Sequence, residues 1–304
     1  MSTEPAAPTS IDRASQRRVL DRLARVGTAP WLNQEVARRM SERLPMIRQA
    51  PHTWIDWWGH LGGGAAAVGA AWPQAVREVV EPTEALLEAS RAQMRRPWWA
   101  LGARAAAPRH LHLESQALEI RAQMVWSNMM LHACLDMDAA FTRWHAVLDV
   151  GGFLMFSTFG PDTLRELRQI YAEAQWPPPH PPYVDMHDIG DRLVACGFVD
   201  PVMDQEQIRL SWTSPQALLA ELRAMGGHLG VSRAAGLRTP RWRDQLQRAL
   251  AARADDEGRI HMTFEIVYGH AVKPPPRPAA GEPTTVSVDA MRAMLRGRRR
   301  SGDA

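Results

Sequence analysis

The chain has 304 residues, of which 45% are hydrophobic, and this suits one large domain with appendages and a packed core. Its formal net charge is +3, but residues 271–304 alone carry seven Lys or Arg against three acids. The remainder is therefore nearly neutral, which argues against a basic face for nucleic acid and leaves only a weak association through the tail sequence RGRRR.

Cysteine usage and hydropathy point to a cytoplasmic protein. Cys134 and Cys196 lack the spacing of a disulfide framework or a zinc site, so we expect reduced thiols. The first residues contain no apolar signal segment, and no apolar run reaches the length that spans a bilayer. We therefore expect no membrane association.

Residues 1–50 predict a helical N-terminal flap. Leu32, Val36, Met40 and Leu44 recur every four residues and would lie on one helix face. From 51 to 272, short apolar runs alternate with helical segments, which is typical of a mostly parallel sheet covered on both faces. The predicted strands are TWIDWW, AVREVVEP, HLHLE, AQMVWSN, GGFLMFSTF, DQEQIRLSW and IHMTFEIVYGHAV.

The second half adds helices and a connector. PDTLRELRQIYAEA predicts a helix whose first turn holds its Pro and Asp, and WPPPHPPY predicts an extended connector. HDIGDRLVACGF predicts a helix with Asp188 as N-cap and Gly197 just past its end. A helical insert is expected at about 215–254, and 273–304 reads as a flexible basic tail with at most one helical piece.

The stretch HTWIDWWGHLGGG places an acid and a glycine cluster at the end of the first predicted strand. Asp56 is followed by Gly59, Gly62, Gly63 and Gly64, and Glu81 ends the second strand. A carboxylate about twenty residues past a glycine loop suits the hydroxyls of a ribose. The alternative is a tight glycine turn with Glu81 capping the next helix, and these residues alone do not decide between the two.

The region from Met124 to Arg168 resembles class I S-adenosylmethionine-dependent methyltransferases. More narrowly, WSN with LH, GGFLMFSTFGPDTLRELR and the stretch from YVDMHDIG to RLSW are similar to the malonyl-acyl-carrier-protein O-methyltransferases of biotin synthesis. The resemblance implies an α/β, Rossmann-like, seven-stranded sheet with an antiparallel last strand. It also implies S-adenosylmethionine as cofactor and a small-molecule or carrier-protein-bound substrate; oligomeric state stays open.

The first half departs from the family pattern. Glycine is expected at three alternating positions after the acid, but Trp58 and His60 hold two of them, and sliding the register by one residue leaves Leu61 in the middle. Gln123 stands where the family has an acid, and Gly27 falls near its flap tyrosine. The predicted cofactor site is thus partly eroded. Its candidate residues are Asp56, Gly59, Gly62, Gly63, Glu81 for the ribose, Glu114 on the adenine side, and Ser127.

Methylation of a carboxylate needs alignment and water exclusion more than a general base, because the acceptor is already ionised. Arg165 and Arg168, after FSTFGPD, are candidates for holding the acid, and His132 for lining the pocket. The rival hypothesis is a non-catalytic binding protein that has lost its cofactor. A methyltransferase for another small molecule is a further alternative.

We expect no metal. His110 and His112 share one strand face and read as packing or surface residues, and a helix start explains Asp188 in DMHD. Ser157 lacks a nucleophile elbow, so a hydrolase triad has no anchor. PPY, at 181–183, does not follow the fourth strand, which argues against a base methyltransferase.

Overall fold

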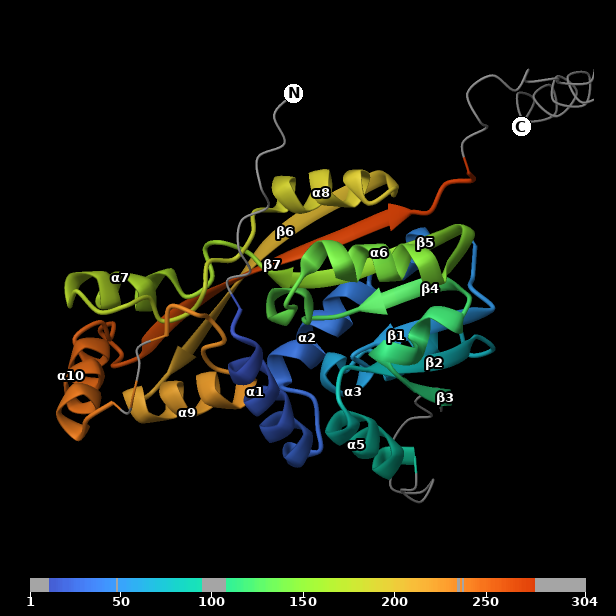
Figure 1. Ribbon diagram of the computed structural model, residues 1–304. Helices are drawn as coiled ribbons and strands as arrows, with labels where there is room; N and C mark the ends of the chain where they lie inside the picture. Colours follow the sequence, from blue (N-terminus) through green and yellow to red (C-terminus); the bar gives the residue numbers. More distant parts are fainter. Residues whose placement is uncertain (1–10, 48, 95–107, 234–235, 237, 277–304) are drawn as a thin grey trace, which may run out of the picture. The chain divides into compact units, whose positions relative to one another are not determined.

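The seven predicted strands form one sheet in the order β3-β2-β1-β4-β5-β7-β6. The computed structural model describes residues 11–47, 49–94, 108–233, 236 and 238–276 (Figure 1). β7 runs antiparallel to β5 and β6, whereas the pairings among β1 to β5 are parallel. The expected sheet with an antiparallel last strand is confirmed. The strands are β1 (Thr53–Trp57), β2 (Val76–Glu81), β3 (Pro108–Leu113), β4 (Ala122–Ser127), β5 (Leu148–Phe159), β6 (Val199–Trp212) and β7 (Ile260–Val272).

Helices connect the strands and cover the sheet. The predicted insert at 215–254 contains two of them, α9 and α10. The α-helices are α1 (Arg13–Val26), α2 (Trp31–Ser41), α3 (Gly59–Gly62), α4 (Ala65–Ala71), α5 (Glu84–Met94), α6 (Met137–Val147), α7 (Arg165–Glu173), α8 (Met186–Ala195), α9 (Pro215–Met225) and α10 (Pro240–Ala251). Short 3₁₀ turns are η1 (Leu44–Met46), η3 (Glu114–Glu119) and η4 (Leu131–Ala133).

Two hydrophobic cores lie on opposite faces of the sheet. Side chains alternate along a strand, so Trp54 and Met124 enter one core, whereas Ile55 and Val125 enter the other. The first core also takes side chains from α2, α4, α7, α9 and α10, and the second from α1, α5, α6 and α8. Figure 1 shows α7, α9 and α10 gathered where β6 ends and β7 begins.

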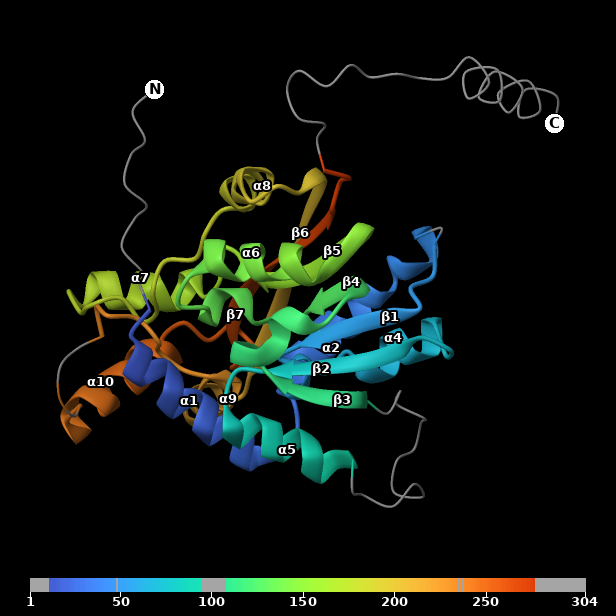
Figure 2. The ribbon, with the colours of Figure 1, turned by 45° about the vertical axis from the view of Figure 1, so that its right-hand side comes forward.

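The N-terminal helices pack as the sequence predicts. Leu32, Val36, Met40 and Leu44 are at most 2% exposed, which confirms their shared buried face. α1 has Asp12 as its N-cap, and the Asp12 side chain accepts a hydrogen bond from the Ser15 backbone N–H at 2.7 Å. It ends where Gly27 adopts φ +75°, and it lies beside α5 (Figure 2).

Two helix starts differ from expectation. Asp188 was predicted to cap α8, but Asp185 is the N-cap and accepts from the His187 N–H at 2.8 Å, so the Asp188 prediction is wrong. α7 begins at Arg165 rather than at the Pro of PDTL. The reason is tertiary: Leu164 adopts φ +54° and its N–H donates to the Thr263 carbonyl of β7 at 2.6 Å.

Some sequence expectations concern the rest of the chain. Within the described residues, no helix has the length and apolar character that crossing a bilayer requires. Cys134 and Cys196 are free. The described residues between 11 and 274 form one compact unit, and the helical piece expected in the basic tail lies outside the described residues.

Candidate functional site

The glycine loop after β1 forms the short helix α3, entered through a residue with strained backbone. Trp58 adopts φ +57°, a left-handed conformation that glycine accommodates without cost and tryptophan does not. The Trp58 carbonyl accepts from the Leu61 and Gly62 N–H groups at 3.1 and 3.0 Å. The loop therefore keeps a tight turn without the glycine expected at its entrance.

Two of the loop glycines are required by packing against the protein itself. A Cβ on Gly64 would lie 2.3 Å from the Trp126 indole nitrogen, and one on Gly59 would lie 2.8 Å from the Asp56 carboxyl carbon. Gly62 differs, because its nearest neighbour, the Asn128 carbonyl oxygen, would be 3.6 Å away. Gly62 is the loop position with room beside it.

Glu81 lies at the carboxyl end of β2, directly under this loop. Its Oε1 accepts hydrogen bonds from the His60 backbone N–H and the Ser90 hydroxyl, each at 2.8 Å. Oε2 is buried and has no hydrogen-bond partner among the described residues. Burial raises the pKa of Glu81 to about 8.

Asp56 is turned toward β2. It is fully buried, and its Oδ2 accepts from the Arg77 guanidinium at 2.6 and 3.0 Å. Burial raises the pKa of the Asp56 carboxyl, while the Arg77 charge opposes the rise. This ion pair joins β1 to β2 below the loop.

The three bulky residues of the loop have different surroundings. Trp57 is fully buried and packs edge-on against Trp144, with ring centroids 6.3 Å apart. His60 is 3% exposed and does not line the cavity described below. Trp58 does line it, and its indole N–H donates to Glu114 at 3.4 Å. Only Trp58 of the three therefore lies beside the cavity.

Asn128, at the end of β4, links the loop to the N-terminal flap and to β5. Its amide donates to the Asn33 and Gly62 carbonyls at 2.7 and 2.6 Å, and its oxygen accepts from the Ser157 hydroxyl at 2.6 Å. The preceding Ser127 is fully buried, and its hydroxyl has no partner among the described residues. Asn128 belongs to the WSN motif, which is the signal that marks it.

A cavity of about 140 Å³ opens between α1, the glycine loop and the turns after β4 and β5. Val19, Leu20 and Leu23 of α1 form an apolar wall. The cavity also takes Trp58, Leu61, His132, Phe159, His180, Tyr183, Leu229 and Phe264. An apolar chamber with a few polar groups is typical of a small-molecule site.

The polar groups of the cavity are uncharged. Burial lowers the pKa of His132 to about 3, so its imidazole is neutral at physiological pH. Burial also lowers the pKa of His180 and raises that of Tyr183. The His180 and Tyr183 rings stack with centroids 4.6 Å apart, and the His132 and Phe159 ring centroids lie 4.3 Å apart.

The two candidate arginines differ in position. Arg165 is half exposed and forms ion pairs with Asp162 and Glu166 at 3.4 and 3.6 Å. Arg168 pairs with Asp162 at 3.8 Å, and its Nε is buried without a partner among the described residues. The Arg168 charge acts on the pKa values of His180 and Tyr183. Arg168 therefore influences the cavity electrostatically, although neither arginine lines it.

The predicted site residues therefore occupy two neighbouring places. Asp56, Glu81 and Glu114 lie against the glycine loop, and Ser127 precedes Asn128, whose amide donates to Gly62, whereas His132 lines the cavity. His180 and Tyr183 were missed because the proline-rich connector that carries them joins the site only through tertiary packing. Tyr183 ends the PPY motif, which the sequence marks only as being in the wrong place for a base methyltransferase, and no sequence signal marks His180.

Comparison with known proteins gives close relatives. No protein-family model matches the chain. A malonyl-[acyl-carrier protein] O-methyltransferase of Laribacter hongkongensis (strain HLHK9) is 38% identical over 278 residues, covering 88% of this chain and 91% of the relative. One of Gallionella capsiferriformans (strain ES-2) is 35% identical, covering 88% and 93%. Among solved structures, a putative methyltransferase of Bacillus halodurans C-125 shares 14% identity at a TM-score of 0.48, covering 78% and 99%, a likeness too weak to bear on function.

The seven-stranded sheet and its antiparallel β7 are those that the sequence resemblance implied, and with the observed strand order they define a class I methyltransferase fold. Sequence identity of 38% with a relative, over 91% of that relative's length, then identifies the family within this class. The chain belongs to the family of malonyl-[acyl-carrier protein] O-methyltransferases.

Proposed function

We propose that this protein is a cytoplasmic S-adenosylmethionine-dependent methyltransferase that esterifies the free carboxylate of a malonyl group carried by acyl-carrier protein, a step of biotin synthesis. The observation that carries the proposal is the 38% identity with a malonyl-[acyl-carrier protein] O-methyltransferase over 88% of the chain. The apolar cavity beside the glycine loop supports it, because methyl transfer to a carboxylate requires a dry, shaped chamber.

The residues around the glycine loop fit the adenosine part of the cofactor. Glu81 Oε2 is a buried acceptor without a partner among the described residues, suited to a ribose hydroxyl, and the Ser127 hydroxyl is likewise unpaired there. Glu114 would serve the adenine side. Its bond from Trp58 is long at 3.4 Å, so breaking this bond to admit a nucleoside costs little. When bound, S-adenosylmethionine supplies the electrophilic methyl group.

The chain's own residues would bind and orient the acceptor. A malonyl carboxylate is already ionised, so no residue has to remove a proton from it. His132 is neutral and would shape the chamber rather than hold the charge. Arg168, whose field reaches His180 and Tyr183, would steer the carboxylate toward the cavity. Arg165, paired with two acids at the surface, would contribute less.

Radiolabelled methyl transfer from S-adenosylmethionine to malonyl-acyl-carrier protein tests the proposal, with acetyl-acyl-carrier protein as the acceptor that lacks a free carboxylate. Calorimetric titration with S-adenosylhomocysteine runs beside it. Glu81→Ala should weaken both binding and transfer. Glu88→Ala, which removes a glutamate exposed on α5, is the matched control and should leave both unchanged.

The rival hypothesis is a methyltransferase-fold binding protein that holds no cofactor. It is supported by the closely packed glycines of the loop and by Trp58 beside the cavity. Absence of S-adenosylhomocysteine binding at millimolar concentration would favour this rival. Binding without transfer to malonyl-acyl-carrier protein would favour a different methyl acceptor.

A further inference from the structure

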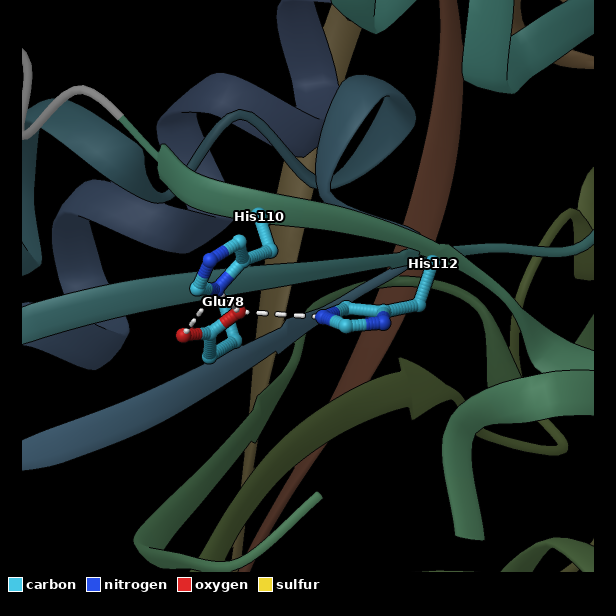
Figure 3. Close-up of side chains that lie close together, drawn as sticks. All are labelled: Glu78, His110 and His112. Atoms are coloured by element: carbon cyan, nitrogen blue, oxygen red, sulfur yellow. Dashed lines mark hydrogen bonds and ion pairs between the residues drawn. The ribbon is translucent and has the colours of Figure 1, made fainter. Parts of the chain in front are cut away.

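Three metal-ligand side chains converge at the edge of the sheet, outside the site described above. Glu78 of β2 lies opposite His110 of the edge strand β3 in the parallel register, and His112 follows two residues later on the same face. Figure 3 shows the two imidazoles, both from β3, directed at the Glu78 carboxylate of the neighbouring strand β2. Glu78 supplies the third ligand atom that the two histidines lack for a metal site.

The spacing of the ligand atoms is close to that of a bound ion. His110 Nδ1 lies 3.1 and 3.2 Å from the two Glu78 oxygens, and His112 Nε2 lies 3.0 Å from Oε2. The ligand atoms of all three residues lie within 4.8 Å of one another. In a tetrahedral zinc site with bonds of about 2.0–2.2 Å, neighbouring ligand atoms lie roughly 3.3–3.6 Å apart. Small side-chain rotations would therefore admit the ion.

The donor set and its exposure select the class of ion. Two imidazole nitrogens suit zinc and other late transition metals, whereas calcium and magnesium prefer oxygen ligands throughout. The Glu78 side chain is 9% exposed and that of His110 is 59% exposed. The site thus has a partly buried anionic anchor and an open side where water can supply the fourth ligand.

We propose that Glu78, His110 and His112 form a binding site for a divalent transition-metal ion, with Zn²⁺ as the occupant. The ion would cross-link the edge strand β3 to β2, so its binding free energy would add to the stability of the folded chain. The site belongs to the same strand as Glu81 but does not depend on methyltransferase activity.

The experiment uses the untagged full chain, stripped with a chelator and titrated calorimetrically with Zn²⁺. We expect one ion per chain and a rise in melting temperature upon binding. Glu78→Gln and His112→Ala should each weaken binding by at least about tenfold, since even residues that only hydrogen-bond to a ligand have effects of that size. Co²⁺, added as a spectroscopic probe, should give visible absorption bands that these variants lose.

His110→Ala removes a ligand without causing a folding defect, because this side chain is mostly exposed and its removal leaves the cores intact. It should also lose Zn²⁺ binding while melting at the temperature of the metal-free parent. His261→Ala is the matched control: its imidazole pairs with one carboxylate, Asp255, at 2.6 Å. No saturable binding, or equal binding by the parent and His110→Ala, would overturn the proposal and leave a hydrogen-bonded cluster only.

Discussion

The backbone N–H of His60 donates to Oε1 of Glu81, at 2.8 Å, and so ties the glycine loop to the end of β2. The second oxygen of the same carboxylate stays buried and unpaired among the described residues. One side chain therefore holds the loop in place and offers an acceptor beside it. The loop and the ribose acid act as one unit, which makes the protonation of Glu81 decisive for ligand binding.

Nucleoside affinity should depend on pH through Glu81. Burial raises the pKa of this carboxyl to about 8, so the free protein holds it largely protonated at neutral pH. A ribose hydroxyl donates best to the ionised form, so affinity for S-adenosylhomocysteine should rise by up to about tenfold per pH unit toward 8 and then level off. Calorimetry from pH 6.5 to 9 measures this rise. In Glu81→Gln the profile should reflect only the ligand's own titration, and an identical profile in both proteins would contradict the assignment.

The same shift predicts an effect on stability with the opposite trend. The pKa of Glu81 is higher in the folded chain than the ordinary value of 4.5, so the folded state binds the proton more tightly. The contribution is fully present below about pH 4.5 and is lost as pH rises through 8. In urea denaturation, the unfolding free energy of Glu81→Gln should therefore fall less between pH 6 and pH 9 than that of the parent. Equal losses would mean that the carboxyl titrates normally.

Two neighbouring glycines should respond differently to alanine. Gly64→Ala places a Cβ against the Trp126 ring, and such overpacking costs about 1–3 kcal/mol or more of unfolding free energy. Gly62→Ala meets nothing closer than 3.6 Å and should fold like the parent. If the cofactor approaches the loop at Gly62, this variant should nevertheless bind S-adenosylhomocysteine more weakly. Parent-like binding by a folded Gly62→Ala would place the ligand elsewhere.

The adjacent tryptophans Trp57 and Trp58 should separate stability from binding. Trp58→Phe keeps most of the apolar contact but removes the N–H that donates to Glu114. Because this bond is long and Glu114 keeps its ion pair with Arg143 at 3.1 Å, S-adenosylhomocysteine affinity should rise only about twofold, the low end of the value of one hydrogen bond. Trp57→Phe alters the core against Trp144 and should change the melting temperature with unchanged affinity. Weaker binding by Trp58→Phe would instead make the indole part of the adenine site.

His132 should make the protein sensitive to acid. Its pKa is about 3 in the folded chain and 6.5 ordinarily, so the unfolded state takes up a proton first as pH falls below 6.5. From pH 7 to 5 this costs about 1–2 kcal/mol of unfolding free energy. His132→Phe, which keeps a ring against Phe159, should lose correspondingly less in urea denaturation. The exposed His187→Phe is the control and should behave like the parent.

The sheet and the flap were predictable because their signals are local and periodic. Buried strands read as apolar runs, and Leu32, Val36 and Met40 mark a helix face by spacing alone. The positions of the cofactor-loop residues in the sequence were enough to predict them as site candidates. Their hydrogen-bond and ion-pair partners could not be predicted in this way. Asp56 meets Arg77, and Glu81 meets Ser90, through contacts that no spacing rule reveals.

The start of α7 and the cavity wall depended on distant segments. Leu164 is held outside the helix by the Thr263 carbonyl, nearly a hundred residues later in the chain. Tyr183 joins the cavity from a proline-rich connector whose composition predicts only an extended path. Glu78 became notable only when the strand register placed it opposite His110.

The docking of α1 has a consequence for the order in which the chain is built. The Arg22 guanidinium donates to the Arg223 carbonyl, a separation of 201 residues, and the Asp12 N–H donates to the Leu229 carbonyl. During synthesis at about 5–20 residues per second, α1 would leave the ribosome about 10–40 s before these acceptors exist. Its packing against α5 can form earlier, but its contacts with α9 and with the turn at Leu229 must wait for that interval. The cavity that α1 lines can therefore close only after Arg223 and Leu229 have been made, when α1 meets the turn that carries Leu229.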